Sequence, residues 1–241
     1  MKVAVITGAL SGIANAVANS LVESGCKVIA LDKNINSLKK DSKLVAYKVD
    51  VTKPDEVNRV FTQINEKFGR VDILVNAVGA TLHTKLIEDI EDEDWNRTFE
   101  LNLRSTFNCT RAVVPIMKKN KWGRIVNISA VAGRTYTFFG GADFTAAKSA
   151  IVGFTQQCAF ELASYGINVN AIAPGLTLTE RVKDMWKNQY SDEERKKILE
   201  RIPIGRPSTE EEQAKTICFL CSDAASYICG EVIDVNGAMF V

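Results

Sequence analysis

Short apolar runs alternate along the chain with longer segments in which apolar residues recur at helical spacing. Runs rich in β-branched residues are typical of strands buried on both faces of a sheet, and the longer segments predict amphipathic helices. The predicted strands are 2–7, 27–32, 44–50, 71–76, 125–129, 167–173 and 231–235. The pattern therefore predicts an α/β protein in which helices lie between strands.

The predicted helices are 54–68, a long helix within 92–119, a helix from about 143, and the charged segment 180–201. Pro54 suits the first turn of its helix because its backbone has no N–H to satisfy. Ser208 or Thr209 is expected to cap a further helix whose first turn is acidic. The chain shows no internal repeat, low-complexity segment or second domain, so residues 1–241 are predicted to form one domain.

A glycine-rich turn lies between the first predicted strand and the first helix. The run KVAVIT is followed by GALSGIA and then by a helical pattern that ends at Gly25. A strand, a glycine turn and a helix in this order are typical of a dinucleotide-binding unit. Gly8 permits the tight turn, Gly12 lets the backbone approach a pyrophosphate, and the helix N-terminus supplies amide donors and partial positive charge.

The second predicted strand ends in an acid, Asp32. A carboxylate there accepts hydrogen bonds from both hydroxyls of an adenosine ribose and repels a 2′-phosphate. The glycine turn carries no Arg or Lys to hold that phosphate. These residues favour NAD over NADP as the cofactor, although Lys33 next to the acid weakens the distinction.

The stretch 125–153 combines a buried strand, a glycine-punctuated loop and a helix on which Phe144 and Lys148 share one face. With this stretch and the glycine turn, the whole chain resembles the short-chain dehydrogenase/reductase family, especially its 3-oxoacyl-acyl-carrier-protein reductase and hydroxyacid dehydrogenase branches. That family reads N-I-S-S-x-x-G in the strand and Y-x-A-x-K in the helix. Ala130 occupies the position of the second Ser, Phe144 occupies that of the Tyr, and Lys148 is retained.

The resemblance implies a Rossmann-type fold, a doubly wound and mostly parallel sheet of about seven strands with helices on both faces. It also implies a substrate lid at about 180–205 and a small hydroxy or keto substrate. The family assembles through the helix within 92–119 and the helix that carries Lys148, so a homo-oligomer, a dimer or tetramer, is the expected assembly.

The same resemblance places cofactor contacts along the carboxyl edge of the sheet. The expected cofactor-binding residues are Thr7, Gly8, Ser11, Gly12, Ile13, Asp32, Asp50, Val51, Asn76, Ala77, Gly79, Lys148, Pro174, Gly175 and Thr179. Asp50 and the amide of Val51 are expected at the adenine edge, and Pro174, Gly175 and Thr179 are expected at the nicotinamide carboxamide.

The chain also departs from the family pattern outside the catalytic stretch. Ala14 replaces the third glycine of the turn, where one extra methyl is expected to be tolerated. Ala77 and Val78 replace the second Asn and the Ala of the family's N-N-A-G, which is expected to loosen the floor under the nicotinamide. Asn102 in ELNL matches the family asparagine that steadies the catalytic lysine, here Lys148, through a water.

In the family mechanism the Tyr exchanges a proton with the substrate oxygen while a hydride moves at nicotinamide C4, and the Ser orients that oxygen. Phe144 keeps the ring but lacks the reacting hydroxyl, and Ala130 lacks the second donor. We therefore expect carbonyl reduction to be crippled or absent. The catalytic residues that remain by resemblance are Lys148 and Asn102.

Three explanations remain open. The chain is a cofactor-binding pseudoenzyme, an active oxidoreductase with a relocated proton donor, or a non-catalytic subunit that assembles with an active relative. Tyr136, in the loop before the helix, is the candidate for a relocated donor. Ser129, Asp143 and Thr145 lie nearby, but strand alternation turns Ser129 to the opposite face from Ala130.

Charge and hydropathy exclude several other classes of protein. With 30 Lys and Arg against 29 Asp and Glu, the net charge is +1, and no basic stripe is present to bind nucleic acid or an anionic membrane. No apolar run reaches the roughly 18 residues of a membrane span. The first strand begins at residue 2, which leaves no room for a targeting segment.

The six cysteines lie scattered in apolar stretches, which favours reduced thiols in a cytoplasmic protein. Cys218 and Cys221 form a CxxC inside a helical run, where core packing is the expected role. No metal site is therefore expected. The single histidine, His83, is expected to be an exposed loop residue rather than an acid or base.

Overall fold

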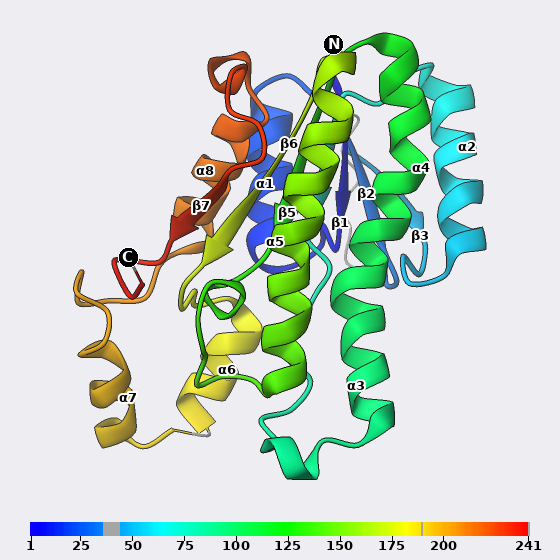
Figure 1. The fold of residues 1–241 in the computed structure, drawn as a ribbon. Helices are drawn as coiled ribbons and strands as arrows, with labels where there is room; N and C mark the ends of the chain where they lie inside the picture. Colours follow the sequence, from blue (N-terminus) through cyan, green and yellow to red (C-terminus); the bar gives the residue numbers. More distant parts are fainter. Residues whose placement is uncertain (36–43, 189, 241) are drawn as a thin grey trace.

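The computed structural model describes residues 1–35, 44–188 and 190–240. Its centre is a parallel sheet of seven strands in the order β3-β2-β1-β4-β5-β6-β7 (Figure 1). The strands are β1 (Val3–Thr7), β2 (Lys27–Asp32), β3 (Leu44–Lys48), β4 (Ile73–Asn76), β5 (Gly123–Ile128), β6 (Ile167–Pro174) and β7 (Val232–Val235). The predicted doubly wound sheet is confirmed, with strand ends that differ from the prediction by at most two residues.

Helices cover both faces of the sheet. They are α1 (Gly12–Glu23), α2 (Pro54–Phe68), α3 (Asp92–Phe99), α4 (Ser105–Asn120), α5 (Ala142–Leu162), α6 (Glu180–Asn188), α7 (Asp192–Leu199) and α8 (Glu210–Leu220). The core on one face is built with α2, α4 and α5, and the core on the other face with α1 and α8. Figure 1 shows α4 and α5 in front of the sheet and α1 and α8 behind it.

Residue alternation along β1 explains why both faces are apolar. Val3 and Val5 belong to the core under α2, α4 and α5, whereas Ala4 and Ile6 belong to the core under α1 and α8. Each fully buried aliphatic side chain of this size contributes about 1.5–3 kcal/mol. Ala14 lies in the second core, 4% exposed, so its methyl fits the contact between helix and sheet as expected.

Two predicted helices are interrupted. The segment within 92–119 forms α3 and α4, joined by a π-helical turn over Glu100–Arg104. The segment 180–201 forms α6 and α7, because Ser191 caps α7 in a capping box with Glu194. Thr209, rather than Ser208, caps α8.

The six cysteines are free thiols. Cys221 is buried in the core under α1 and α8, in agreement with a packing role. Burial raises the pKa of Cys218 to about 11 and also raises the pKa of Cys221, so both thiols stay protonated near neutral pH. Among the described residues, no helix is long and apolar enough to cross a membrane, and no cluster of three or more His, Cys, Asp or Glu could hold a metal ion.

Candidate functional site

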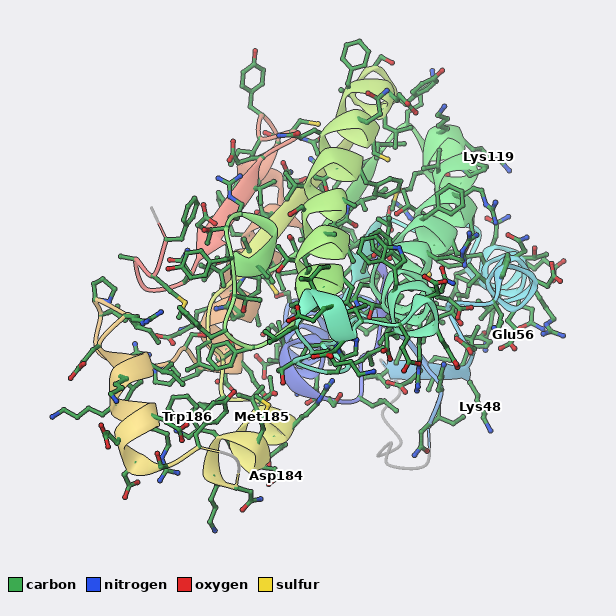
Figure 2. The ribbon with its side chains drawn as sticks, turned by 60° about the horizontal axis from the view of Figure 1, so that its bottom comes forward. Lys48, Glu56, Lys119, Asp184, Met185 and Trp186 are labelled. Carbon is green, nitrogen blue, oxygen red and sulfur yellow. The ribbon has the colours of Figure 1, made fainter. Side chains whose placement is uncertain are left out.

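The carboxyl ends of β1, β4, β5 and β6 form one edge of the sheet, where the candidate site lies. From β1 the chain moves outward through β2 and β3 and then returns at β4 on the other side of β1. The loops after β1 and β4 therefore diverge, which in open parallel sheets makes room for a ligand. Figure 2 turns this edge toward the viewer, with Lys48 of β3 on one side and Asp184, Met185 and Trp186 of α6 on the other.

The glycine turn after β1 has the backbone that its sequence predicts. Gly8 and Gly12 have φ of 66° and 56°, a left-handed conformation that favours glycine. Among the described residues no side chain caps α1 at Ser11, and the first turn from Gly12 and Ile13 carries no acid. The amide donors of this helix start are thus left to a ligand, and they suit a pyrophosphate.

The adenosine end of the predicted cofactor site is acidic. Asp32 ends β2 and accepts a hydrogen bond from the Asn34 amide at 3.1 Å. Asp50 is held by the Thr52 amide and hydroxyl and pairs with Lys33 at 3.0 Å. Burial alone would raise the pKa of Asp50, but the hydrogen bonds from Thr52 and Lys33 lower that pKa below its ordinary value. Val51, next to Asp50, is buried at 3% exposure.

The ends of β1 and β4 are tied by a threonine hydroxyl. Thr7 Oγ1 accepts hydrogen bonds from the amides of Ala77 at 2.9 Å and Val78 at 3.2 Å. Asn76 donates to Asn127 Oδ1 on β5 at 2.8 Å, so the tie continues to the next strand. Thr7 therefore ties the ends of β1 and β4, a role that was missed from the sequence, and the expected loosening of this floor stays a prediction.

Asn102 fastens the loop that follows β4. It is fully buried in the π-helical turn, a feature frequent at functional sites. Its Oδ1 accepts from the Ala80 amide, and its Nδ2 donates to the carbonyls of Ala80 and Thr98, each at 3.0 Å. A Cβ on Gly79 would lie 2.7 Å from Asn102 Oδ1 and 2.9 Å from Lys148 Nζ, so the structure brings these three residues together.

Lys148 is buried on α5, at 5% exposure, with its ammonium against the end of β5. Nζ donates to the Ile128 carbonyl at 2.9 Å and lies 5.8 Å from the centre of the Phe144 ring. Burial lowers the pKa of Lys148 to about 8. Ser129 Oγ donates to the Lys148 carbonyl at 2.8 Å, so this hydroxyl is engaged by the helix.

Ala130 and Phe144 occupy the two sides of the loop 131–141. Ala130 is extended at the end of β5, and Phe144 lies in the first turn of α5. A Cβ on Gly140 would lie 2.8 Å from Phe144 Cδ1 and 2.9 Å from Thr81 Oγ1. The hydroxyl of Thr81 therefore lies near the Phe144 ring, a neighbour that no local sequence signal indicated.

His83 is not the exposed loop residue that the sequence predicted. Its side chain is only 14% exposed, and Nε2 lies 3.1 Å from Oδ2 of Asp143, which is 1% exposed. Thr98 Oγ1 donates to the same carboxylate oxygen at 2.6 Å. The expectation failed because Asp143, in the first turn of α5, faces the loop after β4, which only the tertiary structure reveals.

Tyr136 lies on the outer part of the loop 131–141. Its side chain is 69% exposed and packs edge-on against Phe138, with ring centres 5.4 Å apart. Within the described residues, no hydrogen bond joins its hydroxyl to Lys148 or to the loop after β4. In this conformation, therefore, no described hydrogen bond places the Tyr136 hydroxyl at Lys148.

The end of β6 lies close to the glycine turn. Pro174 ends β6, and the Gly175 amide donates to the Val235 carbonyl at 3.1 Å. Thr179 Cγ2 would lie 3.3 Å from a Cβ on Gly12. The two cofactor motifs, predicted from opposite ends of the chain, thus meet at one place.

The predicted lid rests on the same edge. Arg181 of α6 donates to the Thr81 carbonyl at 2.5 Å. Tyr190, between α6 and α7, packs against Phe139 of the loop 131–141, with ring centres 6.2 Å apart. The lid segment therefore contacts both loops that border Phe144.

Comparison with known proteins agrees with this geometry. Residues 8–239 match a family model described as enoyl-(acyl carrier protein) reductase. The glycine turn, the buried lysine on α5 and this match define the class: the protein belongs to the short-chain dehydrogenase/reductase family.

Curated relatives align over nearly the whole chain. The 3-oxoacyl-(acyl-carrier-protein) reductase FabG of Salmonella typhimurium is 39% identical over 245 residues, which cover 100% of this chain and 98% of that protein. The 3-oxoacyl-(acyl-carrier-protein) reductase of Synechocystis sp. is 40% identical over 248 residues, which cover 99% and 96%.

Solved structures share the fold at lower identity. ElxO with NADP bound matches with a TM-score of 0.92 and 29% identity, covering 99% of this chain and 98% of that one. A tyrosine-to-phenylalanine variant of ElxO with NADPH bound gives the same TM-score of 0.92. Levodione reductase matches with a TM-score of 0.91 and 29% identity, covering 98% and 96%.

The buried ammonium of Lys148 makes stability depend on pH. Below pH 8 Lys148 is protonated in both the folded and the unfolded state, and burial of its charge opposes folding. Above pH 8 the folded state releases the proton, whereas the unfolded chain keeps it up to about pH 10.5. The free energy of unfolding should therefore rise by about 2 kcal/mol between about pH 7.5 and 9.5, relative to Lys148→Met, as measured by urea denaturation. Parallel pH profiles for the two proteins would contradict this.

Proposed function

We propose that the protein binds a nicotinamide cofactor at the carboxyl edge of its sheet but lacks the proton transfer that normally accompanies hydride transfer. The observation that carries this proposal is the Phe144 ring beside the Lys148 ammonium, at 5.8 Å from its centre. A cofactor there would supply a hydride at its nicotinamide. The residues of this chain would bind and orient it but would have no phenol to exchange a proton with the substrate oxygen.

The cofactor proposal specifies NAD rather than NADP. Asp32 ends β2, where its carboxylate would face the adenosine ribose and repel a 2′-phosphate. Lys33, the nearest cation in sequence, pairs with Asp50 instead of remaining available for that phosphate. ElxO, at 29% identity, has NADP bound, so the acid at position 32 is the basis for expecting a different preference here.

Energy transfer from the three tryptophans to bound cofactor tests this proposal. NADH should bind at least tenfold more tightly than NADPH, a difference of about 1.4 kcal/mol, because the Asp32 carboxylate would repel the 2′-phosphate. Asp32→Ala should reduce the ratio of the two affinities to near one, whereas the exposed control Asp55→Ala should leave it unchanged. Tighter binding of NADPH by the wild-type protein would refute the NAD assignment, and binding of neither cofactor would refute the proposed function.

The catalytic deficit follows from the two missing hydroxyls. General acid–base catalysis contributes typically 10²- to 10⁴-fold, and an oxyanion donor about 10²- to 10³-fold. The effects need not multiply, because residues that act as one unit are not additive. Loss of either group would make the reduction of an ordinary ketone slow even with the cofactor bound.

Restoration of both hydroxyls is the direct test of this deficit. Ala130→Ser with Phe144→Tyr should raise kcat/KM at least about 10²-fold over the wild type. The assay follows NADH oxidation with a panel of keto substrates that includes a 3-oxoacyl thioester. The control pair Ala150→Ser with Phe160→Tyr makes the same chemical changes on α5 farther along the helix and should give no gain.

A relocated donor is the second candidate function, and the position of Tyr136 in the loop 131–141 favours it. If Tyr136 supplies the proton after the loop moves, the wild-type protein will reduce some ketone and Tyr136→Phe will abolish that activity. Wild-type turnover that survives Tyr136→Phe would exclude Tyr136. Substantial turnover by the unmodified wild type would also contradict the proposed deficit.

We also propose that the protein is a cytoplasmic homo-oligomer, a dimer or tetramer built through α4 and α5. These helices expose large aromatic side chains: Phe160 is 85% exposed, and Phe107 is 37% exposed and packs edge-on against Phe154 at 6.4 Å. Exposed aromatic side chains on these two helices are the support for a protein–protein interface there. Assembly with an active relative is the third candidate, and the same face would serve it.

Light scattering after size-exclusion chromatography tests the assembly. The wild-type protein should have the mass of a dimer or tetramer, and Phe160→Glu should lower that mass because it places a charge in the apolar interface. Ile87→Glu, an equally drastic change at an exposed site outside α4 and α5, should leave the mass unchanged. The wild type could instead be a monomer that reaches a higher mass only when a related chain is added. That result would refute the homo-oligomer and support a mixed oligomer.

A further inference from the structure

A cavity of about 410 Å³ lies just beyond the end of β5. Three separate segments line it: the loop that follows Ala130, the chain after α7, and the residues that follow β7. Its lining consists of Val131, Thr135, Tyr136, Thr137, Phe138, Phe139, Arg201, Met239 and Phe240. Val131 directly follows Ala130, so the cavity begins next to the position of the missing serine.

The walls of this cavity are aromatic and carry one unpaired cation. Arg201 Cζ lies 4.0 Å from the centre of the Phe138 ring, and Tyr136 packs on Phe138 from another side. In the part of the chain that the structure describes, no carboxylate forms an ion pair with Arg201. The other nearby arginine, Arg134, is neutralised by Asp234 at 3.2 Å. Among the described residues that line the cavity, Arg201 is therefore the one charged side chain.

A guanidinium stacked on an aromatic ring is suited to bind a carboxylate. Stacking occupies the face of the planar group and leaves its edge, with paired N–H donors, free for a bidentate contact. Aromatic walls bury the most apolar surface when the ligand is flat and apolar. A volume of this size accommodates a small molecule. Charge and shape together indicate an aromatic or similarly flat molecule that carries one carboxylate.

We propose that this cavity binds the distal part of the substrate, and that the substrate is an aromatic hydroxy or keto acid whose carboxylate is bound by Arg201. Phe138 and Tyr136 form the walls for its apolar group. The proposal rests on the proposed function, because the carbonyl of such a molecule would lie toward Ala130 and Lys148. Phe139 also packs against Tyr190 of the lid segment, so the wall of the cavity is continuous with the lid.

Calorimetric titration without cofactor tests the cavity alone. The probes are 3-phenylpropanoate and its neutral amide, which have the same shape and differ in charge. The wild-type protein should bind the acid at least tenfold more tightly than the amide. Arg201→Gln should lower the affinity for the acid about tenfold or more and leave the affinity for the amide unchanged. Phe138→Ala should lower the affinity for both probes.

Lys197→Gln is the matched control, because it removes a cation that pairs with Glu193 on α7 outside the cavity. It should leave the affinity for the acid unchanged. Three outcomes would overturn the proposal. The wild type could bind acid and amide equally tightly, Lys197→Gln could lose as much affinity for the acid as Arg201→Gln, or neither probe could bind. Probe binding that appears only on dilution to monomers would also overturn it, because a second copy would then fill the cavity.

A parallel NADH titration separates this proposal from the proposed function. Arg201→Gln should bind NADH as the wild type does, because Arg201 lies outside the glycine turn and the strand ends. Selective acid binding without NADH binding would support the cavity and refute the cofactor proposal. NADH binding without selective acid binding would refute the cavity and leave the cofactor proposal standing.

Discussion

The arrangement of the site depends on the double connection between α5 and the end of β5. The Lys148 ammonium donates to the Ile128 carbonyl, and the Ser129 hydroxyl donates to the Lys148 carbonyl. The Ser129 bond is buried and the Lys148 bond is partly buried, so leaving either polar group without a partner would be costly. They fix the first turns of the helix relative to the strand, whichever residues occupy positions 130 and 144. The position of Lys148 beside the end of β5 is thus fixed by contacts that do not involve the side chains at positions 130 and 144.

The loop after β4 is fixed from three directions, which makes the floor of the site rigid. Thr7 binds its first amides from β1, Asn102 binds both polar groups of Ala80 from the π-helical turn, and His83 reaches Asp143 on α5. Each contact joins segments that are separated in sequence but adjacent in the fold. The position of Gly79 follows, because any side chain there would collide with Asn102 and Lys148.

The sequence predicted the sheet well because strand burial is encoded locally, in runs such as those of β1 and β6. The glycine turn could also be predicted from the sequence. Positive φ at these two positions favours glycine, and the sequence has Gly8 and Gly12 there. Contacts between loops were not accessible, because they depend on how distant segments meet. The pairing of His83 with Asp143 is of this kind, although the capping box at Ser191 was a local signal that could have divided the lid into two helices.

The contact between the lid and the loop after β4 has a consequence for how this protein can diversify. Arg181 binds the backbone carbonyl of Thr81, a group that every amino acid supplies. This hydrogen bond therefore does not depend on the side chain at position 81 or on exposed neighbours such as Leu82 and Leu86. Side chains near this contact can therefore change without removing its acceptor, so sequence variation there and this hydrogen bond can evolve separately.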